Sequence, residues 1–153
     1  METNKIFLKF GVITAIGLIA YFLVAKLLGL HDDPWFRIGN GVIVGIGIYY
    51  AMKTRKMTDG TAFKYFDGLR TGVFTGFVAT IIFVFFMSIY MYHIDKGFAA
   101  DIIDKWVKDY HQGPAILLFF LTLEGFSSTV IMALTFMQKF KYSNNLKKSF
   151  KQV

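Results

Sequence analysis

Cysteine is absent from this sequence of 153 residues, and charged residues are scarce. Without cysteine the chain forms no disulfide framework, thiolate zinc site, iron–sulfur cluster or cysteine nucleophile. Charged residues make up 18% of the chain, whereas a soluble domain averages about 25%, so there are too few charges to cover a globule of this size. Hydrophobic residues reach 55% and the mean hydropathy is +0.49, which indicates a small integral membrane protein.

Proline is also rare, and both occurrences are informative. Pro34 and Pro114 stand directly before apolar runs, where a helix loses nothing by the missing N–H group. Each run is compared with the ~20 residues that cross about 30 Å of hydrocarbon. The four apolar runs cover residues 6–30, 35–52, 71–92 and 115–137. Transmembrane β-strands would instead alternate over about ten residues. We therefore predict an all-α fold, a four-helix transmembrane bundle forming one domain over residues 1–153.

The ends of the first two runs carry further signals. A signal peptide is the alternative for the first run, because basic residues precede it. The run is long for a signal peptide, however, and no A-x-A-like cleavage site follows before Lys26, so we expect an uncleaved anchor. Trp35 and the Tyr49-Tyr50 pair bracket the second run, at positions typical of interfacial aromatic belts.

Two amphipathic segments lie outside the four runs. A short interfacial helix is predicted over residues 98–110, between the third and fourth runs, because its apolar residues recur at helical spacing. These residues are Ala99, Ile102, Ile103, Trp106, Val107 and Tyr110. We expect it to lie on the membrane surface or over the mouth of the bundle. Residues 61–70 have a similar pattern, so we expect one helix that begins at the interface, with Asp59 or Thr61 as its N-cap, and continues into the third run.

The basic residues are distributed unevenly. Twelve of the 17 Lys and Arg residues lie at the start of the first run (Lys5 and Lys9), between the second and third runs, or after the fourth. With the acids counted, that side carries a charge of +9 and the opposite side −1. The positive-inside rule therefore places both termini in the cytoplasm. Topogenesis and attraction to anionic membrane lipids explain the basic face. No nucleic-acid partner is expected, because no nucleic-acid-binding motif accompanies the charge.

One acid interrupts the fourth run. Glu124 lies close to the predicted bilayer midplane, where an ionised carboxylate costs at least about 2.5 kcal/mol, so such residues face the bundle interior, protonate or pair. Its candidate hydrogen-bond partners are Ser128, four residues on, together with Asn40 and Thr80 from other runs. A neutral carboxyl that holds helices together is one interpretation. A proton or cation pathway and a contact with another subunit are the alternatives.

Glycine pairs spaced four residues apart form a second pattern. They are Gly41 and Gly45 in the second run and Gly72 and Gly76 in the third. Such pairs let transmembrane helix backbones approach closely. Within a four-helix protein, we expect these glycines to serve packing between helices of the same chain more than dimerisation.

The three histidines, His31, His93 and His111, all fall on the predicted outer side, where Asp95 is a further candidate ligand. Histidine and carboxylate ligands suit transition metals, but these spacings fit no ligand motif, so we expect no metal and no cofactor. We also find no Ser-His-Asp arrangement and no phosphate-binding glycine loop.

A family resemblance covers essentially the whole chain. The residues that carry it are Ala62-Phe63-Lys64, Gly68, Gly72, Ile89-Tyr90-Met91-Tyr92, Ile94-Asp95 and Phe98. The sequence resembles the bacterial domain-of-unknown-function family numbered 4199, small four-span membrane proteins mainly of the Bacteroidota. The resemblance implies an inner-membrane location and supplies no activity.

We therefore expect a non-enzymatic structural or accessory subunit of the bacterial inner membrane. Its expected partners are membrane lipids, with either a second copy of the chain or a membrane enzyme beside it. The alternative is a small proton- or cation-coupled channel or transporter that uses Glu124. A membrane enzyme is a third, weaker interpretation.

Overall fold

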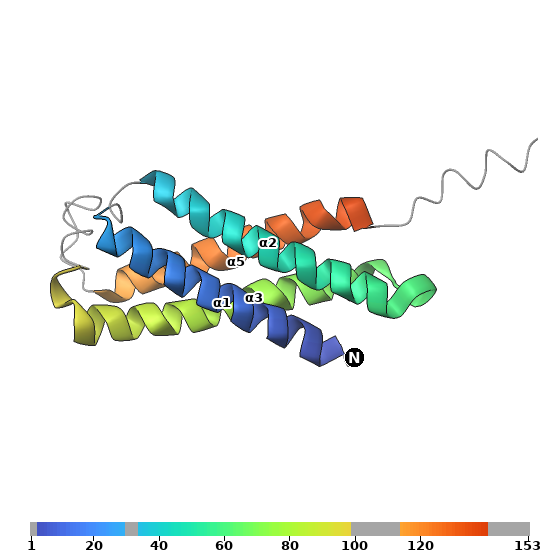
Figure 1. Cartoon of the computed structure of the whole chain (residues 1–153), viewed down its shortest axis with the longest axis horizontal. Helices are drawn as coiled ribbons and strands as arrows, with labels where there is room; N and C mark the ends of the chain where they lie inside the picture. The colour runs from blue at the N-terminus through green and yellow to red at the C-terminus, as the bar shows by residue number, and fades with distance from the viewer. Residues whose placement is uncertain (1–2, 30–33, 99–113, 141–153) are drawn as a thin grey trace, which may run out of the picture.

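The structure, a computed structural model, describes residues 3–29, 34–98 and 114–140. Four long helices dominate it (Figure 1). They are α1 (Thr3–Leu27), α2 (Pro34–Asp59), α3 (Tyr65–Ile89) and α5 (Pro114–Phe140), with two short elements, the 3-10 turn η1 (Gly60–Ala62) and the π-helical turn η2 (Tyr90–Ile94). The described residues contain no strand, and the prediction of an all-α fold is confirmed.

Three of the helices are long and apolar enough to cross a membrane. They are Lys5–Leu27, Tyr65–Ile94 and Pro114–Phe140. Large apolar side chains are exposed on every long helix, among them Ile16, Ile46, Phe85 and Ile131, as expected where lipid surrounds the protein. The second predicted run is not among the three. Its helix, α2, has four glycines and Asn40 within the apolar stretch and Lys53, Arg55 and Lys56 directly after it.

Glycines end the first two helices. Gly29 and Gly60 have φ values of +67° and +52°, the left-handed conformation that glycine adopts without a Cβ penalty. After η1 the chain turns into α3, whose N-cap position is Lys64 and lacks a side-chain cap. The predicted cap was therefore wrong. Asp59 instead pairs with Arg55, one turn earlier in α2.

The long helices alternate in direction (Figure 1). The start of α1, the end of α2, the start of α3 and the end of α5 lie at one end of the bundle, which we call the terminal end. The opposite, distal end holds the end of α1, the start of α2, η2 and the start of α5. The predicted interfacial helix at 98–110 lies outside the described residues except for Phe98, which is buried.

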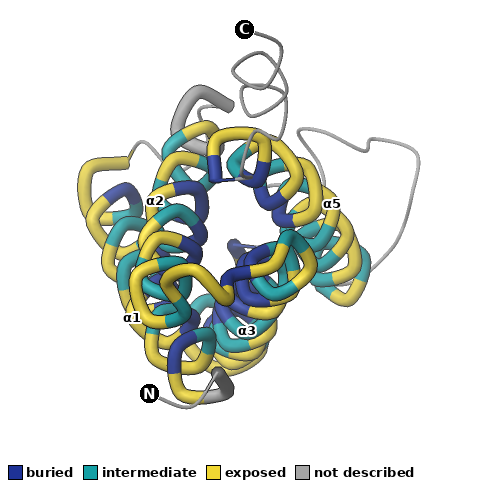
Figure 2. Tube along the Cα trace, turned by 90° about the vertical axis from the view of Figure 1, so that its right-hand side faces the viewer, coloured by how far each residue is buried: buried dark blue, intermediate teal, exposed yellow. Residues whose placement is uncertain are grey.

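Helix α3 is the centre of the packing. It contacts α1, α2 and α5, and α2 also contacts α1 and α5. Figure 2 shows α1 and α5 on opposite sides of the bundle, with buried faces turned inward and exposed faces outward. The core is formed by apolar side chains such as Ile48, Met52 and Met91, with fully buried Thr71 and Thr75. The hydroxyls of these two threonines donate to the carbonyl oxygens of Asp67 and Thr71, each at 2.7 Å.

Candidate functional site

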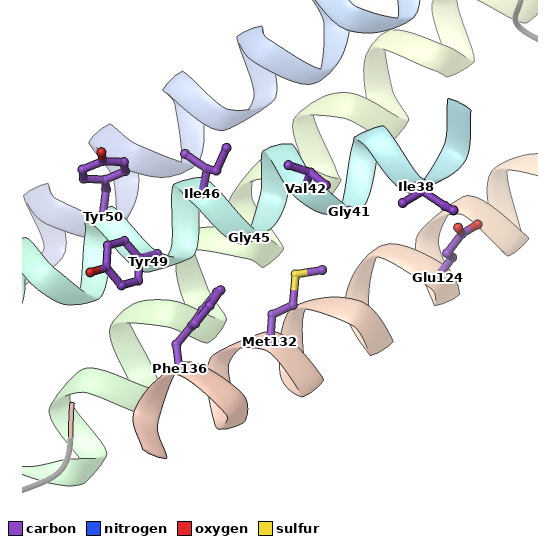
Figure 3. Close-up of a pocket in the computed structure, with 10 residues that line it drawn as sticks. All are labelled: Ile38, Gly41, Val42, Gly45, Ile46, Tyr49, Tyr50, Glu124, Met132 and Phe136. Atoms are coloured by element: carbon purple, nitrogen blue, oxygen red, sulfur yellow. The ribbon is translucent and has the colours of Figure 1, made fainter. Parts of the chain in front are cut away.

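The candidate site is a groove between α2 and α5 that opens on the side of the bundle (Figure 3). Its volume is about 780 Å³, within the ~300–1,000 Å³ typical of ligand sites. It is lined by Ile38, Gly41, Val42, Gly45, Ile46, Tyr49 and Tyr50 of α2 and by Glu124, Met132 and Phe136 of α5. Glu124 is the charged member of this set. Because Phe136 follows Glu124 by twelve residues on α5, the groove is about 18 Å long at ~1.5 Å per residue.

Two glycines form the floor of the groove. A Cβ atom at Gly41 would lie 3.5 Å from Met132 Cε, and one at Gly45 would lie 3.5 Å from Met132 Sδ and 3.7 Å from Phe136 Cζ. These are ordinary van der Waals distances, so neither glycine is required by a close helix contact. The glycines instead leave room above the helix backbone, which the flexible Met132 side chain partly fills (Figure 3).

The end of the groove nearest the terminal end is aromatic. The Tyr49 ring packs against Phe136 and Phe140, with ring centroids 5.7 and 5.3 Å apart. Lys139 Nζ lies 5.2 Å from the centroid of the Tyr49 ring. Lys56 Nζ donates to the carbonyl oxygen of Phe140 at 3.0 Å. These contacts join the C-terminal parts of α2 and α5 at the terminal end of the groove.

Glu124 marks the other end. Its side chain points from α5 toward Ile38 of α2 (Figure 3), and the residue is exposed on the bundle side instead of enclosed in the core.

The predicted polar partners of Glu124 do not gather around it. Ser128 donates its hydroxyl to the carbonyl oxygen of Gly125 at 3.2 Å. Thr80 is buried in α3 against Gly125. Asn40 is four residues from the buried Val44, and its Oδ1 is a buried atom without a hydrogen-bond partner among the described residues. The groove lining contains none of these three hydroxyl and amide groups.

The other glycine pair has a different environment. A Cβ at Gly72 would lie 2.9 Å from Met52 Sδ and 3.2 Å from Ala133 Cβ, and one at Gly76 would lie 2.3 Å from Thr129 Oγ1. These positions belong to an antiparallel seam between α3 and α5 in which small residues alternate across the contact. The seam pairs Gly68 with Met137, Gly72 with Ala133, Gly76 with Thr129 and Thr80 with Gly125. The two glycine patterns, alike in sequence, thus differ in structure.

A second polar cluster lies at the distal end. Lys26 Nζ is 3.1 Å from Asp95 Oδ2 and 4.7 Å from the centroid of the Phe98 ring. Asp95 Oδ1 accepts a hydrogen bond from the backbone N–H of Phe98 at 3.0 Å. The hydrogen bond from Lys26 lowers the pKa of Asp95 below its ordinary value of 3.8. Phe22 packs edge-on against Phe98, with centroids 5.7 Å apart, so the cluster fastens α1 to the chain beyond η2.

This cluster bears on the predicted metal ligands. Asp95 is engaged by Lys26, and His93 is exposed on η2. His31 and His111 lie outside the described residues. Within the described part of the chain, no three His, Asp or Glu residues are grouped to hold a metal ion.

The sequence reasoning missed the groove and the Lys26–Asp95 pair. The Tyr49-Tyr50 pair was recognised as interfacial, but its neighbours Phe136 and Lys139 come from a helix almost ninety residues later. Lys26 lies near the end of the first run and Asp95 just after the third, which puts both on the predicted outer side, and this is the signal that could have suggested their pairing.

Comparison with known protein families identifies one match. The family of proteins of unknown function DUF4199 matches residues 9–140. The chain belongs to the DUF4199 family. The match covers α2, α3 and α5 completely and α1 from Lys9 onward, so the groove and the Lys26–Asp95 pair lie within the family region. No curated protein and no solved structure matches the chain.

Proposed function

We propose that this DUF4199 protein is a non-enzymatic structural or accessory subunit of the bacterial inner membrane that crosses it four times. The fourth crossing is α2, whose uncharged stretch at residues 38–52 spans roughly 22 Å at ~1.5 Å per residue, with the basic side chains at its terminal end reaching the interface. It lies alongside the three apolar helices and exposes Ile38, Val42 and Ile46 on its outer face. Four crossings would put both termini on one side, which is cytoplasmic by the positive-inside rule.

The packing of the core supports a subunit more than a conduction pathway. The interior hydroxyls of Thr14, Thr71 and Thr75 each donate to a carbonyl oxygen four residues earlier in their own helix. A hydroxyl that serves its own backbone is not arranged to replace the hydration shell of an ion. Of the predicted partners of Glu124, Ser128 donates to the carbonyl oxygen of Gly125, and Thr80 is buried against Gly125. What the bundle offers is a sideways-opening apolar groove, a feature suited to contact with other membrane components.

A proton- or cation-coupled channel is the second candidate. It is favoured by the exposed carboxyl of Glu124 in a groove and by two buried oxygen atoms, Asn40 Oδ1 and Thr129 Oγ1, that have no hydrogen-bond partner among the described residues. Ionisable residues inside membranes often mark proton or ion pathways. Asn40 does not line the groove, however, so a pathway would have to form through a different arrangement of α2 and α5.

Access of water to the core separates the two functions, and the lack of native cysteine makes the experiment simple. Thr75→Cys places a thiol in the core, and Lys64→Cys places one on the exposed terminal end as a control. A closed bundle predicts that a charged, water-soluble thiol reagent modifies the Lys64→Cys variant and spares the Thr75→Cys variant in permeabilised membranes. Modification of both variants at similar rates would indicate a hydrated pathway and contradict the proposal.

A further inference from the structure

Basic side chains gather at the aromatic end of the α2–α5 groove. Lys139 is exposed and holds its ammonium group 5.2 Å from the centroid of the Tyr49 ring. Lys53 is also exposed and follows Tyr49 by four residues, which places it one turn further along the same face of α2. Two ammonium groups therefore flank the point where the groove reaches the terminal end.

No acid of the groove lining offsets these charges locally. Glu124, the lining carboxyl, lies at the other end, about 18 Å away along α5. Asp59, the acid nearest in α2, is paired with Arg55. The groove therefore presents positive charge at one end and an apolar trough from there to Glu124.

We propose that this groove binds one anionic phospholipid from the leaflet at the terminal end. Its phosphate contacts Lys53 and Lys139, and one acyl chain lies over Gly41 and Gly45. Basic pockets between transmembrane helices bind anionic headgroups in this manner, and Tyr50, which is half exposed at 51%, stands at the level where tyrosine meets headgroups.

The dimensions of the groove fit an acyl chain. One leaflet contributes about 15 Å of hydrocarbon, half of the ~30 Å core, and the groove is about 18 Å long by the ~1.5 Å rise of α5. A chain entering beside Tyr49 would run the length of the trough and end near Glu124. Met132 lies over the glycine floor, within van der Waals distance of a Cβ at Gly41 or Gly45, and its flexible thioether would move aside to admit the chain.

A partner helix fits less well. The exposed ammonium groups of Lys53 and Lys139 at the terminal end of the groove match a negatively charged headgroup, which an apolar transmembrane helix does not carry. Binding of an anionic phospholipid goes beyond the accessory role and requires only that the protein lies in a membrane. The lipid-binding proposal and the accessory role can therefore each fail without the other.

The test is native mass spectrometry of the purified full chain with phosphatidylglycerol or phosphatidylcholine of identical acyl chains. Wild-type protein should retain one phosphatidylglycerol in preference to phosphatidylcholine. Lys139→Gln should lower that preference about fivefold, as expected for the roughly 1 kcal/mol of one basic residue at a headgroup. Lys9→Gln is the matched control, because Lys9 is exposed near the terminal end on α1, away from the groove, and it should leave the preference unchanged.

The proposed position of the acyl chain is tested by substitutions that fill the groove. Gly45→Leu should abolish retention of both lipids, whereas Gly45→Ala, whose Cβ meets nothing closer than 3.5 Å, should retain them. If Gly45→Leu does not fold, Val42→Trp fills the trough from an exposed position and should have the same effect.

Three outcomes would overturn the proposal. Equal losses in Lys9→Gln and Lys139→Gln would mean diffuse attraction to the basic end. Unchanged lipid retention in both groove-filling variants would mean that the acyl chain of the lipid does not lie in the groove. A dimer that Gly45→Leu converts to monomer would mean that a second copy occupies the groove.

Discussion

Replacing Gly76 with alanine should weaken the seam between α3 and α5. The added Cβ would lie 2.3 Å from Thr129 Oγ1, 2.4 Å from Cγ2 and 2.8 Å from Cβ. A rotamer change can move the first two atoms but not the Cβ of Thr129, which is fixed to the α5 backbone. Since carbon atoms pack at about 3.5–4.0 Å, the two helices must separate by roughly 1 Å. Forced overpacking of this kind costs about 1–3 kcal/mol.

The matched control is the same substitution at Gly45. There the new Cβ meets Met132 Sδ at 3.5 Å and Phe136 Cζ at 3.7 Å, which requires no movement. Alanine also favours a helix over glycine by about 0.8–1.0 kcal/mol on soluble scales. The two substitutions are chemically identical and equally placed in the middle of a helix, yet Gly76→Ala should destabilise the protein and Gly45→Ala should not.

A compensating change identifies the cause. Thr129→Gly removes the three atoms nearest to the new Cβ, so Gly76→Ala combined with Thr129→Gly should recover much of the lost stability, with a coupling energy of about 0.5–3 kcal/mol. Unfolding by SDS in mixed micelles, followed by the near-ultraviolet signal of the aromatic residues, measures all four proteins. Equal stability of Gly76→Ala and Gly45→Ala, or no recovery in the double variant, would refute the reasoning.

Two further predictions concern the ends of the bundle. Both termini should be cytoplasmic, so a periplasm-active reporter fused after Val153 should be silent, and activity of that reporter would reverse the orientation. The Lys26–Asp95 pair should stabilise the distal end at neutral pH, because the pKa of Asp95 is lower in the folded protein than its ordinary 3.8. This stabilisation is complete above the ordinary value and is lost as the pH falls through the lowered pKa. The thermal stability of wild type should thus fall toward that of Asp95→Asn in acid, and a difference that persists unchanged at about pH 2, below the ordinary pKa of a carboxyl, would contradict the pairing.

The helices could be predicted from the sequence because each depends on a local pattern. Continuous apolar runs next to Pro34 and Pro114 predicted the α2 and α5 starts, and the amphipathic stretch before the third run predicted that α3 would begin ahead of it. The residual errors are at helix ends. Capping by Asp59 failed because the side chain had a nearer partner in Arg55, and Gly60 ended α2 there by its positive φ.

The candidate site was less predictable, because helix rotation decides it. Gly41-x-x-x-Gly45 and Gly72-x-x-x-Gly76 have the same spacing, yet one forms the floor of a groove and the other a tight seam. Sequence spacing places both glycines of each pair on one face but does not say what that face meets. Glu124 could be recognised from the sequence because it is a single acid within an apolar run. Its position opposite Ile38 could not, because that depends on how far α2 and α5 are shifted along each other.

Proton flux in reconstituted vesicles is the most direct test of the central claim, that the bundle is closed and its groove serves contact with other membrane components. Wild-type protein and Glu124→Gln, in vesicles that hold a pH-sensitive dye and an imposed pH gradient, should both leak no faster than vesicles without protein. A flux in the wild type that disappears in Glu124→Gln would contradict the accessory role and establish Glu124 as part of a proton pathway.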